Sequence, residues 1–150
     1  MADFLIRNPD FRQATAAIFV EADFIVELGV TPLTIEPGFV EARLPVAQRH
    51  LQHSGVIHAG VQATLADHTA GAAGHTVIGA GQMVLTSTFT IHLLTPARGE
   101  ELRARARVLK AGRRLVIVEA DVFALKGGRE ELTSRATVTL AVIDRPGAPT

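Results

Sequence analysis

The chain has 150 residues, 47% of them hydrophobic and 20% charged, with a formal net charge of zero at pH 7. Its length suits one domain with one sizeable core, and its scattered, balanced charges argue against a nucleic-acid or membrane partner. The absence of cysteine excludes disulfides, thiolate metal sites and cysteine nucleophiles.

Location and assembly can also be anticipated from the sequence. Residues 1–3 lack the basic region that opens a signal peptide, and no apolar run is long enough to span a bilayer, so we expect a cytoplasmic protein. A net charge near zero does little to resist self-association, so the composition is compatible with a homo-oligomer.

The first predicted element is a helix within residues 8–29. Asn8 can cap it, Pro9 suits the first helical position and Gly29 can end it. Residues 33–45 then predict two short strands around a Pro-Gly turn.

A second helix is predicted from residue 57 to about residue 75. Its three glycines lower helix propensity, so we expect them to permit close packing. Because residues 58–75 contain no Lys, Arg or Glu, this helix is expected to be buried nearly all round.

Four strand-like runs follow, at residues 83–97, 101–112, 113–125 and 129–144. In the second run, apolar residues alternate with Arg103, Arg105 and Arg107, as in a strand with one buried face. We expect a long antiparallel meander that covers the second helix in an α+β domain, with residues 146–150 as a loose tail.

Asp67 is the single formally charged residue between His50 and Ala97. It lies on a stripe of very small residues, which leaves room beside the acid. An ionised carboxylate in an apolar region either makes structural hydrogen bonds, here to a backbone N–H in a tight helix–helix contact, or takes part in chemistry.

The start of the same helix is the second candidate feature. His58 is expected near the N-cap, with Ala59 and Gly60 in the first turn, where unpaired N–H groups can polarise a carbonyl oxygen. Nine residues separate His58 from Asp67, which is roughly 13 Å of rise and about 180° around the axis. If both features act on one substrate, two copies of the chain must supply them.

At these residues the chain resembles the hotdog-fold acyl-CoA thioesterases of the phenylacetate-degradation (PaaI-like) type. The pattern of that family is Asn, Gly three residues later, His-Gly-Gly and then Leu-x-Asp. Gln52, Gly55, the triplet at 58–60 and the triplet at 65–67 match it in spacing. Gln52 replaces the usual Asn, and Ala59 replaces the first Gly of the triplet. The resemblance covers roughly residues 49–144.

The resemblance implies a single hotdog domain over residues 1–150, in which a curved antiparallel sheet wraps around a long central helix, with an extra N-terminal helix in residues 1–30. It implies a homodimer or a dimer of dimers with active sites shared between chains. The implied reaction is hydrolysis of an acyl-CoA or aroyl-CoA thioester, with coenzyme A as part of the substrate and no separate cofactor.

The resemblance also implies roles for single residues. Asp67 would be the nucleophile or the general base for water. The Ala59 amide, with Gly60 beside it, would hold the thioester oxygen, while Gln52 would hydrogen-bond near the thioester or the water. His58 would support the helix start.

A hydroxyl that helps to orient the water is implied at Thr86, although the register leaves Ser87 and Thr88 open. Lys110, Arg113 and Arg114 could bind the phosphates of coenzyme A, or could form an ordinary solvated turn.

Other functions remain open. His50, His53 and His58 lie close in sequence, but no cysteine or nearby acid completes a zinc pattern, so no metal is expected. A hotdog-fold hydroxyacyl thioester dehydratase or hydratase is an alternative, because His53 and Asp67 are fourteen residues apart. A non-catalytic acyl-CoA-binding module is another.

Overall fold

The computed structural model describes residues 4–147, so the predictions for residues 1–3 and for 148–150 of the tail lie outside the described residues. Its helices are α1 (Phe11–Glu21), α2 (Asp23–Leu28) and α3 (Ala59–His75), with a short 3-10 turn at Gln48–His50. Its strands are β1 (Thr31–Glu36), β2 (Phe39–Pro45), β3 (Gln82–Leu93), β4 (Glu101–Ala111), β5 (Leu115–Lys126) and β6 (Arg129–Asp144).

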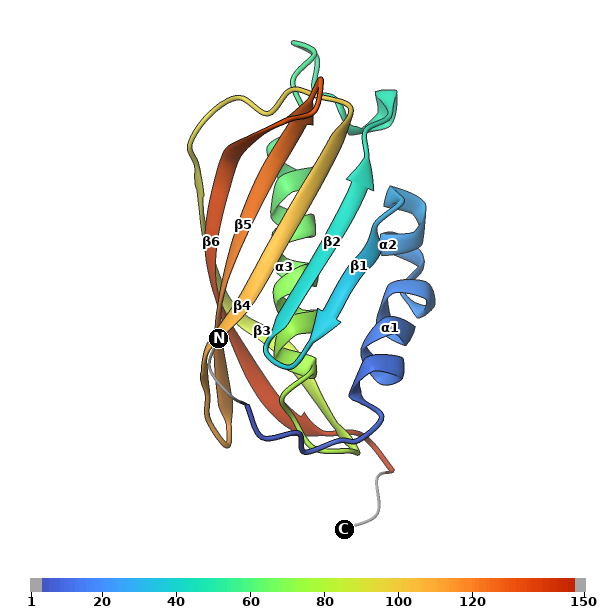
Figure 1. Cartoon of the computed structure of the whole chain (residues 1–150), viewed down its shortest axis with the longest axis vertical. Helices are drawn as coiled ribbons and strands as arrows, with labels where there is room; N and C mark the ends of the chain where they lie inside the picture. Colours follow the sequence, from blue (N-terminus) through green and yellow to red (C-terminus); the bar gives the residue numbers. More distant parts are fainter. Residues whose placement is uncertain (1–3, 148–150) are drawn as a thin grey trace.

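The strands form one antiparallel sheet in the order β1-β2-β4-β5-β6-β3. The sheet curves around α3, and α1 and α2 lie beside β1 (Figure 1). The predicted hotdog architecture, a central helix wrapped by an antiparallel sheet with an extra N-terminal helix, is therefore confirmed.

The predicted meander is wrong at its first step. β3 does not pair with β4 but crosses over to pair with β6, and β2 takes the place beside β4. The inward side chains of β2 and β4 face the same core: Val40 and Ala42 of β2 lie opposite Ala106 and Ala104 of β4, all fully buried. The crossover leaves β3 as an edge strand of the sheet.

The N-terminal helical region also differs from the prediction. The helix begins at Phe11 rather than at Pro9, and Asn8 accepts a hydrogen bond from the Asp10 N–H at 3.0 Å, which stabilises the turn before the helix. The helix is then interrupted at residue 22, which lies between α1 and α2 in an extended conformation. In an unbroken helix Phe19 and Ile25 would point about 120° apart, and the break allows both to enter the core.

The glycines of α3 serve different purposes. A Cβ at Gly74 would overlap Leu140 of β6, so Gly74 permits the close helix–sheet packing that the sequence predicts. A Cβ at Gly60 would lie 3.0 Å from the His58 ring, and one at Gly71 would meet nothing within 4 Å. Close packing against the sheet therefore explains one of the three glycines.

The prediction that α3 is buried nearly all round is wrong for the single chain. The sheet covers one side of the helix, where Leu65, Ala66 and Ala70 are fully buried. On the opposite side, Asp67 and Gly71 are only half-buried and line an open cavity. No helix within residues 4–147 is long and apolar enough to cross a membrane.

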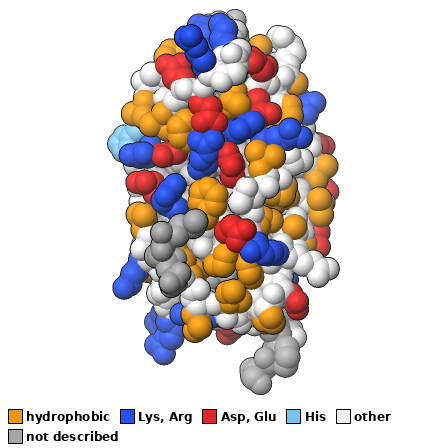
Figure 2. Space-filling model, viewed as in Figure 1, with side chains coloured by type: hydrophobic (Ala, Val, Ile, Leu, Met, Phe, Trp, Pro, Cys, Tyr) orange, Lys and Arg blue, Asp and Glu red, His pale blue; other side chains and the backbone are white. Residues whose placement is uncertain are grey.

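The outer face of β4 carries the predicted arginines. Arg105 contacts Glu41 of β2 at 3.0 Å and Glu130 of β6 at 2.7 Å, and it lies over the Phe123 ring. In the space-filling view, basic and acidic side chains are interleaved on this side of the molecule (Figure 2). The alternation in residues 101–112 thus gives one buried face and one outer face, where Arg103 and Arg105 are paired with glutamates and Arg107 lies over the Phe39 ring.

Candidate active site

Asp67 lies in the middle of α3 and accepts a hydrogen bond from β3. Thr86 Oγ1 donates to Asp67 Oδ1 over 2.7 Å. The pairing of β3 with β6 shifts register between Thr86 and Thr88, which leaves Ser87 in a bulge. Of the three hydroxyl residues that the sequence leaves open, Thr86 contacts the acid. Within residues 4–147 no backbone N–H donates to Asp67. The purely structural role considered from the sequence, a hydrogen bond to a backbone N–H, is therefore not observed.

Beside Asp67 is a cavity of about 620 Å³ between α1, α3 and β3. Its apolar lining is contributed by Ile18, Ala22, Met83, Val84 and Leu85. Gly71, one turn after Asp67, also lines the cavity, and its missing side chain leaves open space there. The site therefore offers a carboxylate next to a largely apolar volume.

The start of α3 is organised by His58. Its ring Nδ1 accepts a hydrogen bond from the Gly60 N–H at 2.8 Å, so His58 is the N-cap of the helix. The Gly60 N–H, which lies beside the Ala59 amide, is therefore engaged within the chain. No acceptor within residues 4–147 binds the Ala59 N–H, which remains available in the first turn.

Gln52 and Ala59 line a second cavity of about 480 Å³. The Gln52 backbone forms a turn with Val56 and Gly55, and its side chain is half-buried at the cavity wall. This cavity shares no lining residue with the one beside Asp67. One chain thus brings Asp67 together with Thr86, and Gln52 with Ala59, but it does not bring the two pairs together.

Comparison with known proteins identifies the family of this protein. Residues 54–131 match the family model described as the thioesterase superfamily. The chain belongs to this family. The "Proofreading thioesterase EntH" of Klebsiella pneumoniae is 30% identical over 109 residues, which are 73% of this chain and 80% of the relative. Hydrolysis of thioesters is therefore the general activity of this thioesterase.

Two solved structures extend the comparison. A thioesterase family protein from Silicibacter pomeroyi is 31% identical, with a TM-score of 0.88 over 89% of this chain and 98% of that protein. A Bacillus halodurans protein crystallised with CoA is 29% identical, with a TM-score of 0.65 over 69% of this chain and 66% of that protein. The predicted resemblance to hotdog-fold thioesterases is confirmed by these matches.

Two histidines of the thioesterase, His68 and His75, pack against α1. The His68 ring meets Phe19 edge-on, with 4.7 Å between ring centroids. His75 Nδ1 lies 3.0 Å from the Thr15 hydroxyl. Burial lowers the pKa of both rings below the ordinary histidine value; the Asp67 carboxylate partly opposes this for His68, whereas the Arg145 charge adds to it for His75.

Sequence reasoning missed several residues that line the two cavities of the thioesterase. His68 and His75 line the Asp67 cavity, and their spacing from Asp67 along the helix could have indicated this. Arg145 lines the same cavity, but its position just after β6 gives no sequence signal. Gln62 lines the Ala59 cavity and is 3% exposed, with no described donor for its Oε1.

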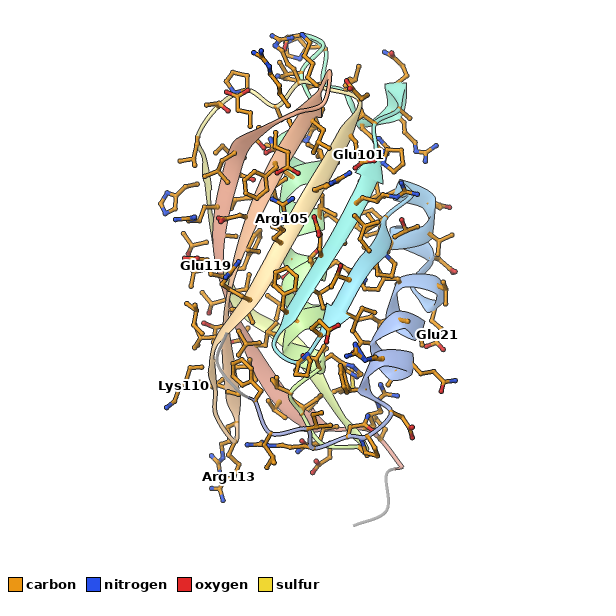
Figure 3. The ribbon with its side chains drawn as sticks, viewed as in Figure 1. Glu21, Glu101, Arg105, Lys110, Arg113 and Glu119 are labelled. Carbon is orange, nitrogen blue, oxygen red and sulfur yellow. The ribbon has the colours of Figure 1, made fainter. Side chains whose placement is uncertain are left out.

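The predicted basic residues lie elsewhere. Lys110 and Arg113 project from the β4–β5 hairpin, at the end of the molecule (Figure 3). Neither they nor Arg114 line the cavities that contain Asp67 and Ala59. Within residues 4–147 no group of three or more His, Asp or Glu side chains could hold a metal ion.

Proposed function

We propose that this thioesterase hydrolyses an acyl-CoA or aroyl-CoA thioester to the free acid and coenzyme A, with Asp67 as general base or nucleophile. The observation that carries the proposal is the Asp67–Thr86 pair beside an apolar cavity. The apolar volume suits an acyl or aryl group, and the related Bacillus halodurans protein was crystallised with CoA.

The available N–H of Ala59 supports the polarising role. A carbonyl oxygen that accepts this bond at the positive end of α3 becomes more negative in the transition state, which the helix end stabilises. If Asp67 is the base, it takes a proton from water while the water oxygen attacks the carbonyl carbon. The C–S bond then breaks, and the sulfur of coenzyme A leaves with a proton.

We infer that each site is completed by a second chain. β3 has twelve residues and pairs with β6 on one side, and within residues 4–147 no strand pairs with its outer edge. Its Leu85 and Leu93 are each about half exposed. Long edges of this kind readily pair with another strand. A homodimer joined there would also cover the open side of α3 and exclude water around Asp67. In a dimer of dimers, each pair of chains would form the same shared sites.

The remaining residues take supporting roles in this proposal. Gln52 hydrogen-bonds near the thioester or the water, from the same cavity as Ala59. His58 holds the helix start through its bond to Gly60. Lys110, Arg113 and Arg114 are candidates for the phosphates of coenzyme A if the bound molecule extends to the β4–β5 hairpin.

The proposal is tested by free-thiol release from a panel of acyl-CoA and aroyl-CoA thioesters, with acyl-pantetheine thioesters as comparison. Turnover of CoA thioesters that is lost in Asp67→Asn supports it. Addition of water to an enoyl-CoA without thiol release would instead indicate a hydratase. Tight binding of acyl-CoA without any reaction would indicate a binding module.

A further inference from the structure

The cavity beside Asp67 follows α3 for two helical turns. Asp67, Gly71 and His75 succeed each other at intervals of four residues and all line it. Eight residues correspond to about 12 Å of helix rise. The open space at Gly71 connects the two ends, so an acyl group that reacts at Asp67 can extend toward His75.

A polar chain lies at the far end of this cavity, in which Thr15 and His75 are buried and Arg145 is exposed. His75 is 5% exposed, and its Nδ1 lies 3.0 Å from the hydroxyl of Thr15, which is fully buried. Its Nε2 lies 3.2 Å from Nη2 of Arg145. A guanidinium can only donate, so Nε2 accepts from Arg145 and Nδ1–H donates to Thr15. This arrangement requires neutral His75, and both burial and the Arg145 charge lower the pKa of the ring.

Arg145 places a positive charge at this end of the cavity. No carboxylate within residues 4–147 forms an ion pair with Arg145, and the other contact of its guanidinium is Nε to the Gln82 carbonyl at 3.3 Å. The other charged groups that line the cavity are Asp67 and Glu21. Glu21 is exposed and lies on the outer flank of α1 (Figure 3), so it stands at the rim of the cavity.

We propose that Arg145, positioned by His75 and Thr15, selects acyl groups that end in a carboxylate. This inference rests on the proposed thioester hydrolysis. A guanidinium binds a carboxylate through two parallel hydrogen bonds. Here the guanidinium contacts His75, which follows Asp67 by two helical turns. The apolar wall between them matches a methylene chain or an aromatic ring rather than the polar pantetheine arm of coenzyme A.

The test compares two substrates of equal chain length, octanedioyl-CoA and octanoyl-CoA. We expect the unaltered enzyme to favour the carboxylate-ended substrate at least tenfold in kcat/KM, mainly through a lower KM. In Arg145→Gln that ratio should fall at least tenfold, and Arg145→Lys should restore part of it. His75→Gln should lower the ratio by a smaller factor, because it removes the acceptor that orients Arg145.

Two results would overturn the inference while the proposed function stands. One is an unaltered enzyme that hydrolyses octanoyl-CoA as well as octanedioyl-CoA. The other is an Arg145→Gln variant that loses activity equally on both, which would assign Arg145 to the phosphates of coenzyme A.

A binding measurement separates the subsite from turnover. Calorimetric titration with free octanedioate should show binding that Arg145→Gln weakens at least tenfold, with octanoate as the reference ligand. If no thioester is hydrolysed, the proposed function fails, and this measurement still decides the anion subsite. Equal affinities for the two acids, or an unchanged affinity for octanedioate in Arg145→Gln, would reject the anion subsite.

Discussion

Thr86 donates its hydroxyl hydrogen to one oxygen of Asp67 over 2.7 Å, although the two residues belong to different elements, an edge strand and the central helix. This bond fixes the orientation of the carboxylate and engages Oδ1. Within residues 4–147 no donor binds the other oxygen, Oδ2, which can therefore face a water molecule or a thioester carbonyl carbon.

Asp67→Asn should keep the fold and remove most of the turnover. The amide can still accept the Thr86 bond, but it can act neither as a base nor as a nucleophile. We expect a loss of at least about 10²-fold in kcat, or roughly 3 kcal/mol of barrier. Asp23→Asn, an equivalent change at an exposed residue of α2, is the control. A folded Asp67→Asn variant with near-normal kcat would exclude the proposed role.

Thr86→Val should lower kcat about tenfold or more, because a hydrogen bond to a charged group contributes roughly 1.5–3 kcal/mol. Thr86→Ser keeps the hydroxyl and should retain most of the activity. Ser87→Ala and Thr88→Val serve as matched controls from the same strand. If either control is as damaging as Thr86→Val, the hydroxyl that supports the reaction has been assigned to the wrong residue.

Local patterns predicted most of the fold but not the strand order. The alternation in β4, the turn residues between strands and the left-handed Gly29 at the end of α2 are short-range features that the sequence carries. The pairing of β3 with β6 depends on contacts between residues more than forty positions apart. The alternating pattern of each strand is equally compatible with either neighbour.

The candidate site shows the same division between local and distant information. Asp67 and His58 stand out in the sequence, one as a lone acid and the other as a capping residue. Arg145 reaches the Asp67 cavity only because β6 ends beside the last turn of α3. Its distance of 70 residues from His75 leaves no periodic signal by which the sequence could indicate the contact.

His58→Ala should lower the free energy of unfolding by about 1 kcal/mol, because the Gly60 N–H loses its acceptor at the helix start. Urea unfolding of the variant measures this, with exposed His53→Ala as the control from the same loop.

Gln52→Ala should leave stability nearly unchanged and reduce turnover less than Asp67→Asn does. A larger kinetic effect at Gln52 would reverse the proposed ranking of these two residues.

Stability should fall as the pH drops below about 6.5, the ordinary histidine pKa. The pKa values of His50, His68 and His75 are lowered in the fold, chiefly by burial. Between the folded pKa values and 6.5 the unfolded chain binds more protons, so acid favours unfolding there. Below the folded values this loss levels off.

Each of these histidines adds at most about 1.4 kcal/mol per pH unit to this dependence. Urea midpoints at pH 5, 6, 7 and 8 measure it. His75→Gln should flatten the dependence, while carboxylates contribute equally to both proteins. Identical pH dependence in the variant and the unaltered protein would contradict the assigned shift at His75.

A site shared between two chains predicts recovery of activity from two inactive variants. Asp67→Asn removes the carboxylate. Ala59→Pro removes the N–H that would bind the substrate oxygen, and proline is tolerated at the first helical position. The preceding residue, His58, has φ −60° and ψ 138°, a conformation that a following proline accepts. Each variant alone should be nearly inactive.

When the two variants are refolded together in equal amounts, about half of the dimers should be mixed. In a mixed dimer one site holds both defects and the other holds neither, so about a quarter of all sites should be intact. Activity should return to about that fraction of the unaltered level. The separation of Asp67 and Ala59 into two cavities of one chain motivates this expectation. If cross-linking shows mixed dimers and the mixture stays inactive, Asp67 must work with a donor of its own chain.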